Sequence, residues 1–252
     1  MAGGRRRRVP DIRLPVLTDG DWGNVHTVLA LDLATVDSGA AVFADRALMQ
    51  RVPLDEGHAY TIPVAHHTPA SWSLARRLAA IEIWVDELLD YLPIDAVVME
   101  SHPFAQGMRH RQETVEGLAM ARAAAMIPAA QRGIPCAAFS VNDARYLVCS
   151  LPAPQETTGG DAVKAKVVYN MQVLGYEVPE KKRGVPNDNV ADAMCLGEAI
   201  ARLLALHHLQ TAYGDRPGNG NNPPMTAQPG ERPRGRRLTC TVQRSSPEEA
   251  HG

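Results

Sequence analysis

The chain has 252 residues, of which 45% are hydrophobic, so it is long enough to bury the core of one ordinary domain. Its four cysteines are far apart in the sequence and form no CxxC pair, which favours buried free thiols. No stretch approaches the roughly 20 apolar residues needed to cross a bilayer, so we expect a cytoplasmic protein with no membrane partner.

The formal net charge of −2 hides two basic ends and an acidic body. The body, residues 14–210, carries 15 Lys and Arg against 23 Asp and Glu, which argues mildly against binding to nucleic acid. Both ends are rich in Arg, Gly, Pro and Asn and lack apolar periodicity, so we expect them to be disordered. These patterns predict a basic arm at 1–25, a single domain at 26–210 and a disordered tail at 211–252.

Short apolar runs alternate with longer helical patterns along the body, which is typical of an α/β domain. The run 28–33 predicts a central strand, 38–43 predicts its hairpin partner, and a third strand is expected within 47–63. Apolar residues at helical spacing predict an amphipathic helix over 71–91. The remaining expected elements are a strand at 94–100, a helix at 113–132, a strand at 135–140, and helices at about 141–149, 161–174 and 189–209.

Acidic residues stand where two predicted strands end. Asp32 and Glu100 each follow hydrophobic neighbours, which is costly for a carboxylate unless something compensates its charge. Asp188 and Asp192 are four residues apart at the start of the last predicted helix, so both can project from one face. Two divalent cations held by such carboxylates could cleave a phosphodiester bond. The alternative is that each acid only caps a turn or complements a helix dipole.

The order of these acids resembles the RuvC-type Holliday-junction resolvases of the RNase H-like superfamily over residues 27–208. The motifs that carry the resemblance are LALDLATVDSGAAVF, AVVMESHPFAQG, GLAMARAAA and NDNVADAMCLGEAI. It implies an RNase H-like mixed sheet flanked by helices, with Asp32, Glu100 and Asp192 as catalytic carboxylates that bind Mg²⁺, for which Mn²⁺ would substitute. It also implies a homodimer that cuts four-way junctions or other branched DNA, without a small-molecule cofactor, in a bacterial nucleoid or a phage-infected cell.

The sequence departs from the family pattern at three places. Residue 189, three before Asp192, is Asn rather than an acid, so the fourth metal ligand is either Asp188 or Asn189. Leu33 and Ala34 stand where the family has Pro-Gly. The aromatic residue that the family places after the catalytic Glu corresponds to Phe104, displaced by one residue, which either stacks on DNA bases or anchors its loop.

Basic residues close to the last motif offset the acidic body. The four lysines of the chain all fall within 164–182. Lys164 matches a family lysine near the scissile phosphate, so the resemblance makes it a catalytic residue as well as a DNA contact, and Arg145 matches a basic position on the preceding helix. The other expected DNA contacts are Lys166, Lys181, Lys182 and Arg183, for which a solvated basic face is the alternative.

The histidines are weaker candidates for metal ligands or catalytic residues. His66-His67 and His207-His208 lack further ligands at metal-binding spacing, so we expect structural or surface roles for them. His102, two residues after Glu100, could assist proton transfer.

Three other functions remain to be weighed against junction cleavage. An RNA-directed nuclease would use the same carboxylates, and a DNA-binding scaffold without activity would fit the loss of an acid at Asn189. An actin-like ATPase also opens with a strand and an Asp, but it needs a second duplicated domain and glycine-rich phosphate loops, for which this body is too short.

Overall fold

The computed structural model describes residues 22, 24–44, 47–48, 51–53, 59–61, 64–101, 112–150, 160–182 and 184–214. Most of the expected basic arm, the expected tail beyond 214, and the predictions for His102, Phe104 and Arg183 lie outside the described residues. Within these ranges, no helix combines the length and the apolar character that a membrane span requires.

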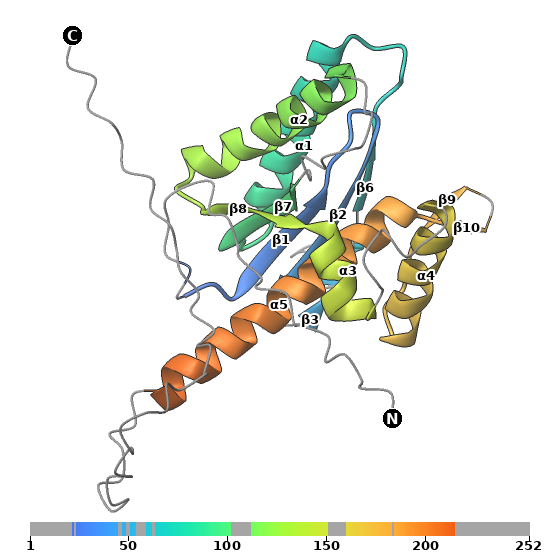
Figure 1. Ribbon diagram of the computed structural model, residues 1–252. Helices are drawn as coiled ribbons and strands as arrows, with labels where there is room; N and C mark the ends of the chain where they lie inside the picture. Colours follow the sequence, from blue (N-terminus) through green and yellow to red (C-terminus); the bar gives the residue numbers. More distant parts are fainter. Residues whose placement is uncertain are drawn as a thin grey trace, which may run out of the picture.

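A mixed β-sheet forms the centre of the molecule (Figure 1). Strand β1 (Thr27–Asp32) pairs antiparallel with β2 (Asp37–Ala44) and parallel with β7 (Ala96–Ser101), and β7 pairs parallel with β8 (Cys136–Ser140). The β1–β7 register aligns Leu31 with Met99. The next residues along the two strands, Asp32 and Glu100, therefore reach the same edge of the sheet side by side.

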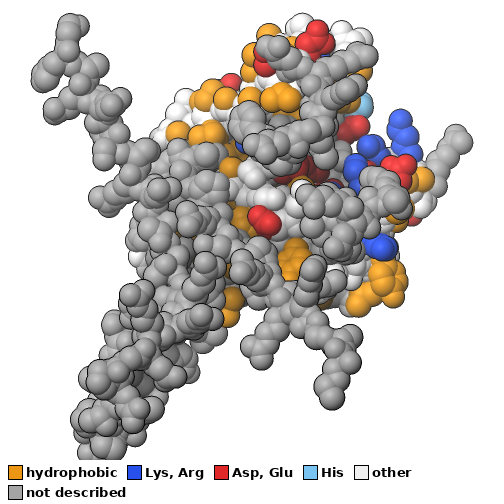
Figure 2. Space-filling model, in the orientation of Figure 1, with side chains coloured by type: hydrophobic (Ala, Val, Ile, Leu, Met, Phe, Trp, Pro, Cys, Tyr) orange, Lys and Arg blue, Asp and Glu red, His pale blue; other side chains and the backbone are white. Residues whose placement is uncertain are grey.

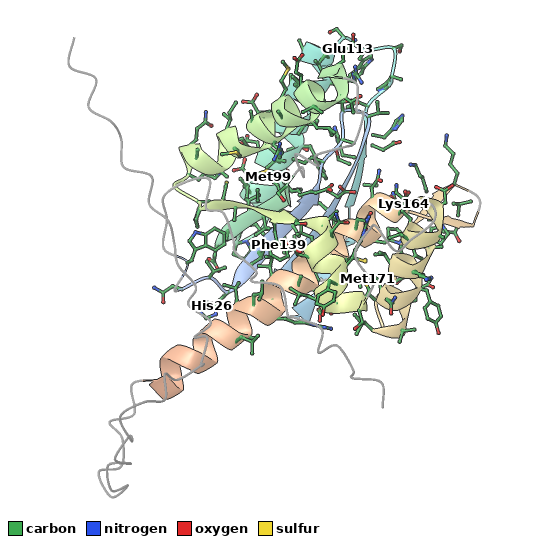
Figure 3. The ribbon with its side chains drawn as sticks, viewed as in Figure 1. His26, Met99, Glu113, Phe139, Lys164 and Met171 are labelled. Carbon is green, nitrogen blue, oxygen red and sulfur yellow. The ribbon has the colours of Figure 1, made fainter. Side chains whose placement is uncertain are left out.

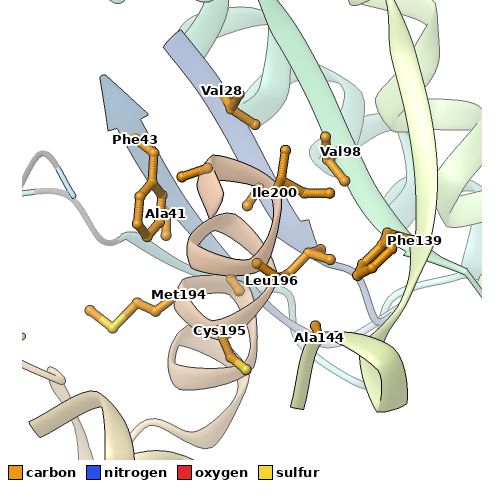
Figure 4. Close-up of a cluster of buried hydrophobic side chains, with 14 of the residues drawn as sticks. Val28, Ala41, Phe43, Val98, Phe139, Ala144, Met194, Cys195, Leu196 and Ile200 are labelled. Carbon is orange, nitrogen blue, oxygen red and sulfur yellow. The ribbon is translucent and has the colours of Figure 1, made fainter. Parts of the chain in front are cut away.

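Helices cover both faces of this sheet (Figure 1). One face packs against α1 (Leu74–Tyr91) and α2 (Gln112–Gln131), around a buried cluster that includes Leu31 and Met99. The other packs against α3 (Val141–Cys149), α4 (Gly160–Val173) and α5 (Asp188–Gly214). Leu196 and Ile200 of α5 lie on that second face against the strands (Figure 4). Hydrophobic burial on both faces thus fixes α5 across the sheet.

Two glycines let α5 approach β2 closely. A Cβ atom on Gly39 would lie 2.4 Å from the backbone carbonyl of Asn189, and one on Gly197 would lie 2.3 Å from the Phe43 ring. Any larger residue at these positions would push the helix away from the strand. The start of α5, which carries Asp188 and, one turn later, Asp192, is therefore held against the end of the sheet.

The third strand expected within 47–63 is present only as short pieces, of which β3 pairs with β2. That region holds three short strands, β3 (Ala47–Leu48), β4 (Arg51–Pro53) and β5 (Ala59–Thr61), and β4 and β5 pair only with each other. The longer partner of β2 is β6 (Val64–His67), which begins after Pro63. Proline lacks an N–H group for the ladder, which breaks the region into pieces.

Other boundaries also differ from the sequence-based predictions. Helix α1 begins at Leu74 rather than at residue 71, because Ser73 caps it by accepting a hydrogen bond from the backbone N–H of Arg76 at 3.4 Å. Helix α5 continues to Gly214, five residues past the predicted end. A hairpin of β9 (Glu180–Lys182) and β10 (Val185–Pro186) was not predicted, because its strands are short and exposed.

Candidate active site

Asp32 and Glu100 form the centre of the candidate site. Burial is the main cause that raises the pKa of Asp32 well above its usual 3.8. The negative charges of Glu100 and Asp192, and a hydrogen bond with Glu100, raise it further. The carboxylates from β1, β7 and α5 are therefore close enough for their charges to influence one another, as the sequence led us to expect.

Asp192 is the most deeply buried of the three acids, with 4% of its surface exposed. Both of its carboxylate oxygens accept hydrogen bonds from Arg145 of α3, from Nε at 3.1 Å and from Nη2 at 2.7 Å. Burial raises the pKa of Asp192, the Arg145 charge opposes this rise, and Glu100 adds to it. The guanidinium therefore supplies the positive charge that a buried carboxylate needs.

Asp188 and Asn189 have partners outside this group of acids. Asp188 forms an ion pair with Lys164 of α4, and although burial opposes it, this pairing lowers the pKa of Asp188. Asn189 donates a hydrogen bond from Nδ2 to the backbone oxygen of Asp37 at 3.0 Å. The structure thus places both candidates for the fourth ligand beside the site, each already engaged in another contact.

Lys164 and Lys181 lie beside these acids, and we call this pair of lysines the basic rim. Lys181 Nζ lies 3.3 Å from Asp37 Oδ2, and Lys164 stands where α4 faces the start of α5 (Figure 3). Figure 2 shows Lys and Arg side chains gathered at the edge formed by α4 and the β9–β10 hairpin. Lys182 and Lys166 are exposed. Because residues two apart on a helix point in nearly opposite directions, Lys166 faces away from the side on which Lys164 pairs with Asp188.

A cavity of about 580 Å³ opens between the rim and helices α1 and α2. Its basic lining residues are Arg77, Lys164 and Lys181, and Asp188 and Asn189 border it as well. Arg77 was not predicted as a site residue, because an arginine on an amphipathic helix is typical of a solvated face. Only the fold shows that it donates a hydrogen bond from Nη1 to Thr35 Oγ1 at 3.2 Å, in the turn after β1.

The histidines of β6 have structural partners. His66 stacks on Trp84 with ring centroids 4.8 Å apart, and His67 Nδ1 lies 2.6 Å from Asp37 Oδ1. These contacts agree with the structural or surface roles expected for them. The side chains of His207 and His208 lie outside the described part of the chain.

The carboxylates of Asp32, Glu100 and Asp192 are suitable ligands for a hard divalent cation, although Asp192 is paired with Arg145 in this structure. Among the described residues, no three acidic, histidine or cysteine side chains are spaced around a common metal position. Arg145 binds both oxygens of Asp192, so this carboxylate is engaged in another contact. Three carboxylates that repel one another in a half-buried site nevertheless have the chemistry that magnesium selects.

Comparisons with known proteins support the fold and the family. No protein-family model matches the chain. The crossover junction endodeoxyribonuclease RuvC of Parafrankia sp. is 37% identical over 145 residues, which cover 55% of this chain and 72% of the relative. The RuvC of Frankia alni is 33% identical over 183 residues, which cover 71% of this chain and 82% of the relative.

A solved structure shows the same architecture. Thermus thermophilus RuvC in complex with a Holliday junction substrate superimposes with a TM-score of 0.51 and 17% identity, covering 73% of this chain and 97% of that one. The fold therefore belongs to the RNase H-like class. On sequence similarity, the chain belongs to the RuvC family of crossover junction endodeoxyribonucleases.

Proposed function

We propose that this protein is a metal-dependent endonuclease that cleaves four-way DNA junctions by paired symmetric nicks. The observation that carries the proposal is the convergence of Asp32, Glu100 and Asp192 from three separate elements at one edge of the sheet. Family membership supports the choice of a branched-DNA substrate. Burying three acids together costs stability, so their placement calls for a functional reason.

Asp32, Glu100 and Asp192 are the residues that would hold Mg²⁺, and Mn²⁺ should substitute because it also accepts carboxylate oxygens. When bound, the metal would activate a water molecule and stabilise the leaving oxygen of the phosphodiester. For Asp192 to become a ligand, the cation would have to share its oxygens with Arg145 or displace the arginine from them. Asp188 is the weaker candidate for a fourth ligand, since it already neutralises Lys164.

Lys164 and Arg145 supply positive charge for the phosphate. Lys164 is 42% exposed and borders the cavity, so its ammonium can exchange the Asp188 carboxylate for a phosphate oxygen at little desolvation cost. Arg145, once free of Asp192, presents a planar donor pair suited to a phosphate. Both would stabilise the charge that develops in the transition state.

The DNA strand would pass along the basic rim and the cavity. Lys181 and Lys182 lie on the β9–β10 hairpin beside it, while Lys166 would contact a more distant phosphate. Because each neutralised phosphate releases counterions, binding should weaken steeply as salt rises. Contacts from Phe104, Arg183 and the arginine-rich ends remain predictions from the sequence.

Two symmetric cuts in a four-way junction require two sites, which a homodimer with a two-fold axis provides. Exposed apolar side chains on α1 and α2 support such a pairing: Ile83 is 59%, Met120 45% and Ile127 42% exposed. Figure 2 shows hydrophobic side chains along this outer helical layer. We expect this enzyme to act in the cytoplasm at the nucleoid, whether a cell or a phage encodes it.

The deciding experiment compares three substrates: a labelled four-way junction, a matched linear duplex and an RNA–DNA hybrid, each with Mg²⁺ or with EDTA. The variant Asp32→Asn removes one charge from the site. Asp161→Asn makes the same chemical change at an exposed position on α4 and serves as the control. We expect paired nicks in the junction from the wild type and from Asp161→Asn only, and only with metal.

The other outcomes each point to a different function. Cleavage of the hybrid in preference to the junction would favour an RNA-directed nuclease. Junction binding without any cleavage would favour a scaffold that has lost activity. Unchanged cleavage by Asp32→Asn would remove the proposed site altogether.

A further inference from the structure

Two cysteines that are 46 residues apart in the sequence meet between α3 and α5. The Sγ atoms of Cys149 and Cys195 lie 3.9 Å apart. Cys149 is the last residue of α3, and Cys195 lies in the buried second turn of α5. Both are free thiols, as the sequence led us to expect, although Cys149 is only partly buried. Their close approach could not be predicted from their spacing along the chain.

The thiol pair lies next to the Arg145–Asp192 pair, between the same two helices. Cys149 follows Arg145 by four residues on α3, and Cys195 follows Asp192 by three residues on α5. Residues at these spacings are neighbours on one helix face. The two helices are thus joined by an ion pair and, one turn further along each, by a pair of thiols.

The two sulfur atoms differ in their surroundings. Cys149 is partly exposed, whereas Cys195 has 0% of its surface exposed. The hydrogen bond between the two thiols lowers the pKa of Cys149, and the Arg145 and Arg202 charges lower it further, whereas burial and the Asp192 charge oppose this. The same contact raises the pKa of Cys195. Cys149 is therefore the more exposed and more acidic thiol of the pair, and Cys195 is the buried thiol behind it.

We propose that Cys149 and Cys195 form an oxidation site at which a hydroperoxide closes a disulfide between α3 and α5. The Cys149 sulfur attacks one peroxide oxygen, the O–O bond breaks, and hydroxide leaves to give a sulfenic acid at Cys149. The Cys195 sulfur then attacks the Cys149 sulfur, the S–O bond breaks, and water leaves. The two thiols lose two electrons in total, and hydrogen peroxide is reduced to two waters.

The geometry permits this bridge with a local movement. The Sγ separation must shorten from 3.9 Å to the roughly 2.05 Å of a disulfide bond. Helix α3 is only nine residues long and ends at Cys149, and Ser150 follows it in a left-handed conformation with φ of 52°. The end of a short helix can move more easily than the buried α5, so α3 would supply the shift.

Cys136 provides an internal comparison. It is also fully buried, but it lies on β8 in the hydrophobic cluster of the opposite sheet face, away from Cys195. The sheet separates the two thiols, so a hydroperoxide should not join Cys136 to either member of the pair.

The test treats the full-length chain with hydrogen peroxide, blocks remaining thiols, digests with trypsin without reductant and identifies joined peptides by mass. We expect peptide 146–164 joined to peptide 184–202, with the loss of two hydrogens, and a return to the free peptides on reduction. Peptide 133–145, which contains Cys136, should remain unjoined. The oxidised chain should unfold roughly 5–10 °C higher, because the bridge constrains the unfolded chain.

Variants separate this pair from the other cysteines. Cys149→Ser should abolish the joined peptides, while Cys136→Ala should form them as the wild type does. Over-oxidation of Cys149 to sulfinic acid without a bridge would overturn the proposal, as would a bridge that uses Cys136 or Cys240, or a lower unfolding temperature after oxidation. Mapping the wild type requires no variant, so a misfolded Cys149→Ser would not prevent the test.

Discussion

Arg145 binds Asp192 through both carboxylate oxygens, at 3.1 and 2.7 Å, inside the group of acids that we propose as the metal site. The side chain of Asp192 is 5% exposed and that of Arg145 is 17% exposed, so the pair is shielded from water. Without metal, the arginine neutralises the acid. A metal ion bound here would compete with the arginine for the same two oxygens.

This competition predicts how Arg145→Gln changes metal binding. Removing one partner of a shielded ion pair should lower the free energy of unfolding of the metal-free protein by about 3–5 kcal/mol. Mg²⁺ should then raise the unfolding temperature more in the variant than in the wild type, because Asp192 is free to bind it. Thermal unfolding in EDTA and in Mg²⁺ measures both effects.

Arg202→Gln is the matched control for this prediction. Arg202 pairs with Glu198 at 2.7 Å in the same region of α5, but it lies away from the acids. Its removal should leave the response to Mg²⁺ unchanged. An equal response in wild type and Arg145→Gln would show that the arginine does not compete with metal.

Asp32→Asn should make the metal-free protein more stable while abolishing cleavage. The neutral amide removes the repulsion with Glu100 and Asp192, which should raise the free energy of unfolding by on the order of 1 kcal/mol at neutral pH. Loss of the carboxylate should lower the rate on the order of 10³-fold. Chemical denaturation and junction cleavage give the two values, and a destabilised variant would contradict the repulsion.

The raised pKa of Asp32 also predicts how the stability of the protein depends on pH. The folded-state pKa of Asp32 is raised, so above 3.8 the unfolded chain loses this proton while the folded protein keeps it. Asp32 therefore lowers stability progressively as the pH rises from about 4 through its raised pKa. Denaturation of the metal-free wild type across this range should show the decline, and Asp32→Asn should flatten it.

If Asp192 is a metal ligand and Asp188 is not, conservative variants of the two residues should give different results. Asp188→Asn removes the partner of the half-exposed Lys164, so stability should change by less than about 1 kcal/mol and cleavage should fall modestly. Asp192→Asn should abolish cleavage. Equal losses in the two variants, measured by single-turnover kinetics, would instead make Asp188 a ligand.

Asn189→Asp tests whether the family acid can be restored. The Asn189 amide donates to the backbone oxygen of Asp37 at 3.0 Å, a bond that a carboxylate cannot make. We therefore expect a loss of about 1–3 kcal/mol in stability and no gain in activity. Increased cleavage would show that the position can bind metal directly.

Gly39→Ala should displace the first turn of α5. The new Cβ atom would lie 2.4 Å from the Asn189 backbone, which should lower stability by about 3 kcal/mol or more and reduce cleavage. Gly117→Ala is a milder control, since its Cβ would lie 3.3 Å from the Thr35 methyl group. Similar unfolding temperatures for the two variants would contradict the close approach of α5 to β2.

Much of the fold was predictable from local pattern. The runs around Leu31 and Met99 read as buried strands because continuous apolar residues suit the interior of a sheet, and the helix at Leu74–Tyr91 showed its apolar face directly. The β9–β10 hairpin was not predictable, because its strands are exposed and its turn depends on Gly184 at a φ of 81°. Short exposed strands of this kind depend on packing against neighbouring elements for their stability.

The sequence by itself determined which acids stand at strand and helix ends, because Asp32, Glu100 and Asp192 each sit in an apolar pattern that no surface segment would have. Tertiary structure decided what these groups touch. Arg145 meets Asp192 across 47 positions, and Cys149 meets Cys195 across 46, because α3 and α5 pack on the same face of the sheet. Contacts between helices depend on their packing, and no local pattern in either helix encodes its partner.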